Sequence, residues 1–365
     1  MKNICFLATD FPPDVGGIES HAYELAKALV QIGQNVYVIC PHKDDRLEYE
    51  LMDGIHVYRV KMLKQKPFYN WKLRAFLKKF IQKNPVDLIH IHGMRPLESA
   101  DGLGIPTVFT NHTSGFLQRL EKPKLLQGRL KQRLNYVDLV LAPSFELCDA
   151  TTKIGYTGPV KFVTNGVDTS KFIPSMTTGL SAQKVFLLAR RLVDKNGVVV
   201  FAKALTLMKN RNFKVLIAGD GVDKPEMQRI LKEGNSLEQV EFLGFVPNHQ
   251  MPEIYRKAHF SVLPSFYEAT SITGLESMAC GLPLVGTNVG GIPYLIEQGK
   301  SGYLVPSHDA KALAQQMDEV IALSDEEYHQ LSNHSRERAV TMFDWKVVAK
   351  ETLDLYNTIG QKASV

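Results

Sequence analysis

The sequence contains no apolar run of the roughly 18 to 20 residues that a bilayer-spanning helix needs. Its start, MKNICFLATDF, is too short for a signal peptide and is interrupted by Thr9 and Asp10, so we expect a first β-strand there. None of the four cysteines, at positions 5, 40, 148 and 280, has a partner at the spacing of a metal-binding or redox motif. These absences predict a cytoplasmic protein whose cysteines are small core residues in a reducing compartment.

The G-x-G-x-x-G fingerprint of dinucleotide binding is also absent, together with the acidic residue that would bind an NAD ribose. This argues against a nicotinamide-dependent oxidoreductase. No fixed-period repeat or low-complexity tract appears. The composition, 44% hydrophobic and 22% charged over 365 residues, is typical of a soluble globular enzyme with two domains rather than of a disordered or fibrous chain.

Short apolar runs alternate with longer amphipathic segments along the chain. VYVIC, DLIHIH and DLVLAPS predict buried strands, and ESHAYELAKALVQIG predicts a helix that ends at Gly33. The alternation pauses at residues 172–184, a candidate linker rich in Ser, Thr, Pro and Gly, and then resumes. It predicts an α/β protein with two Rossmann-like, doubly wound domains that face each other across a cleft. We expect the first domain at residues 1–178 and the second at 179–343, with residues 344–365 packing back on the first.

The formal net charge of +5 is unevenly distributed. Residues 61–83 carry eight Lys or Arg and no acid, and apolar residues of this segment recur at helical spacing. Such a helix can lie on an anionic membrane surface, or it can cover a sheet and leave its charged side in water. A second basic stretch at 119–134 adds weight to the membrane alternative. Nucleic acid is not expected as a partner, because no stacking aromatic array or groove-reading motif accompanies the lysines.

Two loops carry residues suited to phosphate. Gly16 and Gly17 stand between a predicted strand and a predicted helix, where the backbone can approach an anion closely; a plain turn is the alternative. In the second half, Arg190, Arg191 and Lys195 directly follow a predicted buried strand. Cations at that place are suited to neutralise a diphosphate, although solvated loop charges would give the same pattern.

The stretch YEATSITGLESMACGLP, residues 267–283, contains two carboxylates among small and apolar side chains. Glu268 lies in a predicted loop before a helix, and Glu276 lies about one turn inside that helix. Carboxylates only accept hydrogen bonds and repel phosphate, so these two are suited to the vicinal hydroxyls of a sugar or ribose. The structural alternatives are a helix-dipole carboxylate for Glu268 and a buried salt bridge for Glu276.

Nearly the whole chain resembles the retaining glycosyltransferases of glycosyltransferase family 4. The resemblance lies, in this order, in FPPDVGGIESHAYELAKAL, DLIHIHG, VTNGVD, RRLVDKNG, IAGDG, the long run from LGFVPNHQ to GYLVP, and FDWKVVAKETLDLY. The single motifs are modest signals, whereas the glutamate pair with its surrounding run is highly specific. Membership implies the GT-B fold of two Rossmann-like domains and transfer of a sugar from a nucleotide donor with the anomeric configuration kept.

The resemblance implies catalytic roles for four residues. Arg191 and Lys195 match the arginine and lysine that hold the donor diphosphate, although the spacing between them is shorter than in the common pattern. Glu268 is expected to contact the hydroxyls of the donor sugar. His112, after TVFT, matches a family histidine that faces the transferred sugar, with a polar turn residue as the alternative. The roles of His90 and His92 stay open.

The resemblance also implies a set of donor-binding residues. The backbone amides of residues 271–273 should contact the sugar and the diphosphate, and Glu276 should contact the ribose. Residues 245 and 246 should pack on the base. The N-terminal glycine pair should approach the donor phosphate. By name these are Gly16, Gly17, Phe245, Val246, Ser271, Ile272, Thr273 and Glu276. Many relatives have Gly-Phe-Gly after the first glutamate, where this chain has Ala269, Thr270 and Ser271, so the identity of the donor sugar is open.

The expected activity is hexosyl transfer from a nucleotide sugar, with UDP-sugars favoured by family base rates alone. No carboxylate nucleophile stands out, so we expect a same-face substitution rather than the double displacement of retaining glycosidases. No hydrophobic-flanked Asp-x-Asp is present, so we expect no metal and no other cofactor. The expected acceptor is a glycan or lipid-linked hydroxyl in cell-surface polysaccharide or glycolipid synthesis, at the inner face of the cell membrane. A sugar phosphorylase or nucleotide-sugar hydrolase on the same fold, and a non-catalytic sugar-nucleotide-binding subunit, are the alternatives.

Overall fold

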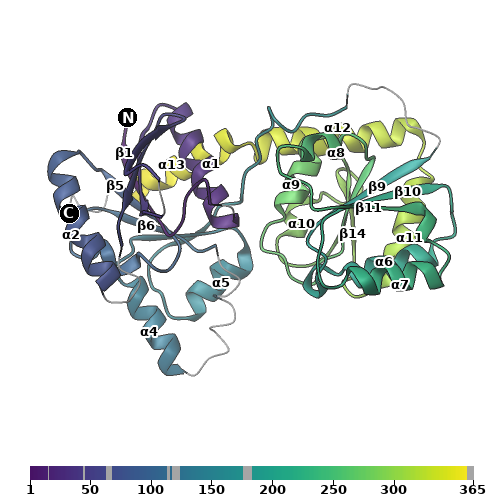
Figure 1. The fold of residues 1–365 in the computed structure, drawn as a ribbon, viewed down its shortest axis with the longest axis horizontal. Coiled ribbons are helices and arrows are strands. Elements are labelled where there is room, and N and C mark those ends of the chain that lie inside the picture. Colours follow the sequence, from purple (N-terminus) through teal and green to yellow (C-terminus); the bar gives the residue numbers. More distant parts are fainter. Residues whose placement is uncertain are drawn as a thin grey trace. The chain divides into compact units, whose positions relative to one another are not determined.

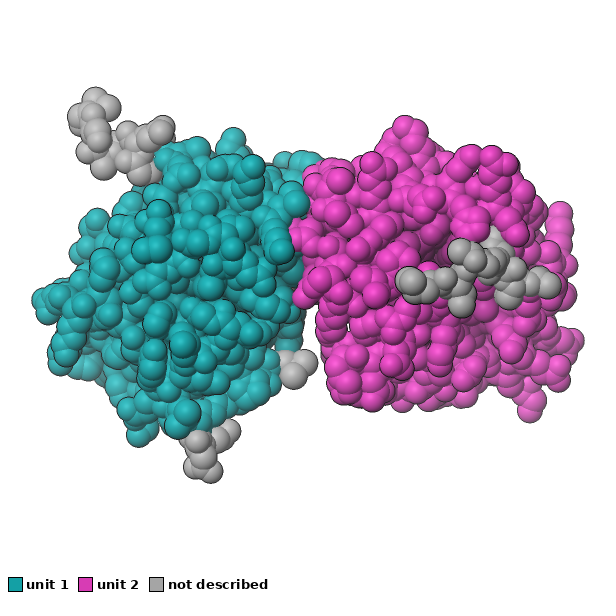
Figure 2. Space-filling view, turned by 90° about the horizontal axis from the view of Figure 1, so that it is seen from above, with its two compact units in different colours: residues 1–166, 345–365 teal, residues 167–344 magenta. Residues whose placement is uncertain are grey.

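The structure of the chain is a computed structural model that describes residues 1–14, 16–43, 46–62, 68–112, 116, 124–175 and 183–359, apart from the side chains of 124–126. The chain divides into two compact units, Met1–Gly166 with Trp345–Val365, and Val167–Asp344 (Figures 1 and 2). Each unit is described separately below.

The boundary between the units lies after Gly166, earlier than the expected position at 178/179. The physical reason is that the segment from Val167 onward is bonded into the second unit. The Val167 N–H donates to the Phe343 carbonyl at 2.8 Å, and the Phe172 ring packs edge-on against Tyr255. Residues 176–182 of the expected linker lie outside the described residues.

The first unit is built on an eight-stranded sheet in the order β3-β4-β2-β1-β5-β6-β7-β8. Neighbouring strands are parallel except for the antiparallel β3–β4 pair. The strands are β1 (Asn3–Ala8), β2 (Asn35–Pro41), β3 (Tyr49–Met52), β4 (Ile55–Val60), β5 (Leu88–His92), β6 (Thr107–Thr110), β7 (Leu139–Ala142) and β8 (Val160–Phe162). The strand order reverses between β1 and β5, and doubly wound sheets bind ligands at the carboxyl ends of strands beside such a point.

The described helices of the first unit cover this sheet. They are α1 (Gly17–Gln31), α2 (Phe68–Lys83), α4 (Lys124–Leu134), α5 (Phe145–Lys153) and α13 (Trp345–Ile359), with the short 3-10 turn η1 (Leu97–Ser99). The expected helix end at Gly33 is confirmed: this residue follows α1 with a φ of 82°, a conformation that glycine adopts readily. α13 lies beside α1, and its buried Val348 and Tyr356 complete the same core (Figure 1).

The second unit is built on a six-stranded parallel sheet in the order β11-β10-β9-β12-β13-β14. The strands are β9 (Lys184–Ala189), β10 (Phe213–Ala218), β11 (Val240–Gly244), β12 (Phe260–Leu263), β13 (Leu284–Thr287) and β14 (Gly302–Val305). The helices are α6 (Val198–Leu207), α7 (Lys224–Glu233), α8 (Met251–Tyr255), α9 (Ile272–Ala279), α10 (Ile292–Leu295), α11 (Ala310–Ile321) and α12 (Asp325–Met342), with the 3-10 turns η2 (Asp194–Asn196) and η3 (Leu237–Gln239). The expected architecture of two doubly wound α/β sheets is therefore confirmed.

Side chains of the central strand β9 alternate between the two faces of this sheet. Phe186 and Leu188 belong to one hydrophobic core, and Leu187 and Ala189 belong to the other. The strand order reverses between β9 and β12, which makes the carboxyl ends of these two strands the expected ligand site of the unit.

None of the helices that the structure describes contains an apolar stretch long enough to cross a bilayer.

Candidate functional site

Polar residues of the second unit gather where its strand order reverses. Arg190 directly follows β9, and the segment from Ser265 to Glu268 follows β12. The Arg190 guanidinium donates hydrogen bonds to the Glu268 carboxylate and to the Ser265 hydroxyl, although its side chain is only 8% exposed. The structure thus joins two strand ends through a largely buried ion pair at the edge where such sheets bind ligands.

Arg190, rather than Arg191, is the arginine beside Glu268. Both residues lie just beyond the end of β9 at Ala189, and the Glu268 carboxylate accepts from the Arg190 guanidinium. Arg191 and Lys195 instead lie exposed on the turn that follows. Within that turn, the buried Asn196 donates a hydrogen bond from its Nδ2 to the Arg191 carbonyl at 2.7 Å.

Backbone contacts fix the loop that carries Glu268. The Gly291 N–H donates to the Glu268 carbonyl at 3.0 Å. Gly290 has a φ of 53°, and a Cβ atom there would lie 1.8 Å from the same carbonyl oxygen, so no other residue fits. Thr287 Oγ1 also donates to the Ser265 carbonyl at 2.6 Å. The loop after β12 is therefore held by the loop after β13, which gives Glu268 a defined position.

The three predicted amide donors lie at the start of α9. The Ser271 side chain caps this helix by accepting from the Gly274 N–H at 3.2 Å, and the Leu275 N–H donates to the Ser271 carbonyl. The amides of Ile272 and Thr273 precede that bond and belong to the helix end whose N–H groups lack intrahelical partners. Their contact with a ligand stays a prediction.

Glu276 lies on the buried face of α9 and is hydrogen-bonded to uncharged groups. The Tyr255 hydroxyl donates to its Oε2 at 2.7 Å, and Asn248 Nδ2 donates to its Oε1 at 3.4 Å. Because the carboxylate is almost fully withdrawn from water, burial raises its pKa to about 7. The salt-bridge alternative for Glu276 is therefore not what these contacts show: its hydrogen-bond partners are a phenol and an amide.

Phe245 and Val246 follow β11 at the same edge of the sheet. Val246 packs against the core, whereas the Phe245 side chain is 81% exposed and presents an aromatic face to solvent.

In the first unit, Gly16 and Gly17 lead from β1 into α1. A Cβ atom on Gly16 would lie 2.1 Å from a carboxylate oxygen of Glu19, the acidic residue of the first helical turn. Gly17 has open space around it. The Glu19 carboxylate thus sits near the helix end where the sequence predicts a phosphate, and it complements the positive end of the helix dipole there.

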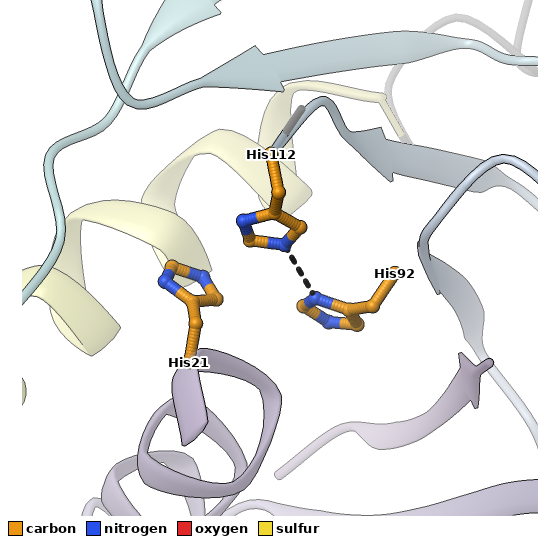
Figure 3. A group of neighbouring side chains, drawn as sticks. All are labelled: His21, His92 and His112. Atoms are coloured by element: carbon orange, nitrogen blue, oxygen red, sulfur yellow. Dashed lines mark hydrogen bonds between the residues drawn. The ribbon is translucent and has the colours of Figure 1, made fainter. Parts of the chain in front are cut away.

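Three histidines from α1, β5 and the segment after β6 meet in the first unit (Figure 3). His92 Nδ1 lies 3.1 Å from His112 Nε2, and the rings of His21 and His112 are in edge-to-face contact with centroids 4.4 Å apart. One nitrogen from each ring lies within 4.8 Å of the others, so these imidazoles are of a type and proximity that could hold a transition metal. Burial lowers the pKa of His21 to about 4 and those of His92 and His112 well below 6.5, so all three are neutral at physiological pH.

His90, whose role the sequence left open, is a structural residue. Its Nε2 lies 2.6 Å from Thr110 Oγ1, and its Nδ1 lies 2.6 Å from the hydroxyl of Tyr356 on α13. Both ring nitrogens are therefore occupied inside the core.

Several residues of the two sites were not predicted from the sequence. In the second unit these are the partners Ser265, Asn248 and Tyr255; in the first unit they are His21 and Asn165, whose Oδ1 lies 2.8 Å from His21 Nδ1. His21 could have been singled out from the sequence, because a histidine on the apolar face of an amphipathic helix needs a polar partner inside the protein.

Two sequence models of known families match consecutive parts of the chain. Residues 15–171 match Glycosyltransferase Family 4, and residues 178–338 match Glycosyl transferases group 1. The chain belongs to the family 4 glycosyltransferases. The resemblance seen in the sequence is thereby confirmed.

This glycosyltransferase is 24% identical to the phosphatidylinositol N-acetylglucosaminyltransferase GPI3 subunit of Saccharomyces cerevisiae, over 99% of this chain and 84% of that one. Its structure is similar to that of sucrose-phosphate synthase from Thermosynechococcus elongatus, with a TM-score of 0.80 and 20% identity over 99% of this chain and 100% of that one. It is also similar to Anabaena HepE, solved in complex with UDP and glucose, with a TM-score of 0.76 and 19% identity over 98% of this chain and 100% of that one. These structural likenesses confirm the expected GT-B fold.

We expect the Glu276→Gln variant to gain stability relative to the wild-type protein as the pH is raised. The folded-state pKa of Glu276 is raised from 4.5 to about 7, so the folded protein holds this proton more tightly than the unfolded chain. The stability from this proton is fully present below the unfolded value of 4.5 and is lost as pH rises through about 7. A shift of this size corresponds to ~3 kcal/mol, and the neutral amide escapes that loss.

Thermal unfolding of both proteins at about pH 5 and about pH 8.5 measures the effect. The unfolding midpoint of Glu276→Gln minus that of wild type should be larger at the higher pH than at the lower. The midpoint of the exposed control Glu253→Gln should follow that of wild type. If that difference were the same at both pH values, the Glu276 carboxylate of the folded protein would be charged at both.

Proposed function

We propose that this glycosyltransferase moves a hexose from a UDP-sugar to an acceptor hydroxyl with retention of the anomeric configuration. The observation that carries the proposal is the Arg190–Glu268 pair at the strand reversal of the second unit. It places a cation suited to a diphosphate next to a carboxylate suited to sugar hydroxyls. HepE, of the same fold, has been solved with UDP and glucose, which supports the choice of donor.

The proposed roles of the site residues follow from their chemistry. Arg190 and Lys195 stabilise the negative charge that develops on the departing diphosphate, so that no metal is needed. Glu268 accepts hydrogen bonds from the donor sugar and Glu276 from the ribose. The amides that begin α9 meet the phosphates, and the exposed ring of Phe245 covers the base.

In the proposed reaction, the bond from the anomeric carbon to the phosphate oxygen breaks as the bond to the acceptor oxygen forms on the same face. The departing phosphate oxygen takes the proton of the acceptor hydroxyl. Catalysis then depends on positioning and on electrostatic stabilisation rather than on a nucleophilic carboxylate. In the first unit, Gly16 and Gly17 are proposed to approach the donor phosphate, and His112 the transferred sugar.

Incubation with a panel of UDP-, GDP- and ADP-sugars, in EDTA and with a lipid-linked acceptor extract, tests this function. We expect a UDP-hexose to shift the thermal midpoint and to label the extract, with NMR showing the anomeric configuration of the donor in the product. Labelled sugar phosphate formed only with added inorganic phosphate would instead identify a phosphorylase, and free sugar without acceptor a hydrolase. Binding without turnover would identify a sugar-nucleotide-binding subunit, and loss of transfer in EDTA would refute metal independence.

We expect Arg190→Gln to lower kcat by about 10²–10³-fold, the scale seen when one preorganised charge-stabilising donor is removed. Arg191→Gln is the matched control, since it removes the same charge from the adjacent, exposed position. The two turnover numbers, measured with saturating donor, decide which arginine acts on the diphosphate. A larger loss for Arg191→Gln would return the role to the residue that the sequence favoured.

We further propose that the first unit binds the membrane that carries a lipid-linked acceptor. A lipid acceptor is supported by the yeast relative, which is a phosphatidylinositol N-acetylglucosaminyltransferase subunit. α2 buries Tyr69 and Leu77 in the core and leaves Trp71 70% exposed beside its lysines. Exposed aromatic and cationic side chains together suit the interface of an anionic bilayer.

α2 and α4 are held together at this surface by η1. Glu98 of η1 accepts hydrogen bonds from Asn70 of α2 and from Arg133 of α4. Neither helix contains an acidic residue. The described parts of the two basic stretches are therefore linked through Glu98, whereas residues 63–67 and 119–123 of those stretches lie outside the described residues.

We expect Lys78→Gln with Lys79→Gln to weaken partitioning onto vesicles rich in phosphatidylglycerol by about 30-fold, since each cation near the surface contributes ~1 kcal/mol. Both lysines are exposed on α2. Vesicle flotation at low and high salt measures the effect. The control Lys232→Gln with Lys311→Gln removes two exposed lysines from helices of the second unit and should change little. Equal losses in the two double variants would mean that net charge alone drives the binding.

A further inference from the structure

The hydrogen-bonded pair of His92 and His112 lies at the strand reversal of the first unit, and its proton positions are chemically determined. A neutral imidazole has one N–H donor and one acceptor nitrogen. In the 3.1 Å contact between His92 Nδ1 and His112 Nε2, one of these nitrogens must therefore carry the hydrogen and the other must accept it. Which one donates decides what His112 can offer to a substrate.

The second nitrogen of His92 gives the answer. His92 Nε2 is buried, and it has no hydrogen-bond partner within the described part of the chain. The His92 ring packs against the Phe6 ring, with centroids 4.6 Å apart, and against the His90 ring, with centroids 4.2 Å apart. Phe6 has no acceptor atom, and both nitrogens of His90 are already occupied by Thr110 and Tyr356.

A hydrogen on His92 Nε2 would therefore be a buried N–H without an acceptor, one of the rarest situations in folded proteins. The hydrogen of His92 belongs on Nδ1, from which it is donated to His112 Nε2. Because His112 Nε2 accepts, the hydrogen of neutral His112 belongs on its Nδ1.

We infer that His92 is a positioning residue that fixes the tautomer of His112, so that His112 presents its Nδ1–H as a hydrogen-bond donor to an oxygen of the bound sugar. The inference rests on the proposed function only for the identity of that ligand. His112 is the half-buried member of the group, whereas His21 and His92 are buried, so it is the ring through which the group can reach a substrate. In this role His112 donates a hydrogen bond and does not act as a base.

His21 holds the His112 ring from another side. The Asn165 carboxamide oxygen accepts from His21 Nδ1 at 2.8 Å, which fixes the orientation of the His21 ring. That ring meets His112 edge to face (Figure 3). It also meets the Trp345 ring edge to face, with the two centroids 5.2 Å apart. His112 is thus confined by a hydrogen bond on one side and by packing on another, which preorganises its donor.

Nitrogen-15 NMR of the histidine side chains in the full protein, without substrate, tests the tautomer directly. We expect a pyrrole-type shift for His112 Nδ1 and a pyridine-type shift for His112 Nε2, with assignment by loss of the signals in His112→Gln. The reverse pattern would overturn the inference. Because this measurement needs no turnover, failure of the proposed transferase activity would leave its result unaffected.

A pair of variants tests the effect on the reaction. His92→Leu removes the donor, and we expect it to mix the His112 tautomers and to lower kcat/KM about tenfold, the scale of one lost hydrogen bond. His92→Asn places an amide donor near the position of Nδ1, and we expect it to restore most of the activity and the wild-type His112 shifts. His329→Leu, on the exposed side of α12, is the control for removing a histidine. If His92→Asn were as impaired as His92→Leu while both stayed folded, the role of His92 would be packing alone.

Discussion

The candidate site of the second unit depends on one constraint, that a charged group withdrawn from water needs a partner of opposite charge. Arg190 stands at the end of the central strand of the second unit with little access to solvent, and Glu268 of the neighbouring strand end supplies the balancing charge. Removing one member of such a pair leaves the other uncompensated in a medium of low polarity. The pair therefore does more than join two loops. It holds a carboxylate and a guanidinium at fixed positions before any substrate arrives, where sugar hydroxyls and phosphate oxygens can become alternative partners.

The first unit also has a group of polar side chains at its strand reversal, but these are imidazoles rather than charged groups. Burial keeps these imidazoles neutral by making the charged form unfavourable. Their order comes from hydrogen bonds between rings and to an amide rather than from ion pairs. The candidate site of the second unit is thus ordered by an ion pair, and the histidine group of the first unit by contacts between neutral side chains. This division suits the proposed reaction, in which negative charge develops on the departing diphosphate.

Much of this could be predicted from the sequence because it depends on periodicity and on short-range pattern. Apolar runs located the parallel strands, and the alternation with amphipathic helices gave two doubly wound units. The position of Glu268 in a loop and of Glu276 inside a helix followed from the residues around them. The motifs also carried the family, because their order along the chain is specific.

What could not be predicted depends on side-chain direction and on distant partners. Two adjacent arginines look equivalent in a sequence, and only the folded path of the chain after β9 brings Arg190 to Glu268. The pKa of Glu276 depends on its burial on the inner face of α9, which no local pattern reveals. The boundary between the units was misplaced because Val167 is bonded to Phe343, far away in the chain. For the same reason the partnership of His21, His92 and His112 appears only when three separate segments are folded together.

The path of α13 has a consequence for the order in which the protein is made. The first unit consists of Met1–Gly166 and a final helix that is translated only after the whole of Val167–Asp344. Every residue of the second unit is therefore synthesised before Val348 and Tyr356, which complete the core of the first unit. Domains usually fold as they emerge, beginning at the N-terminus. Here the first unit is completed only after the second has been made, and His90 meets the Tyr356 hydroxyl only then.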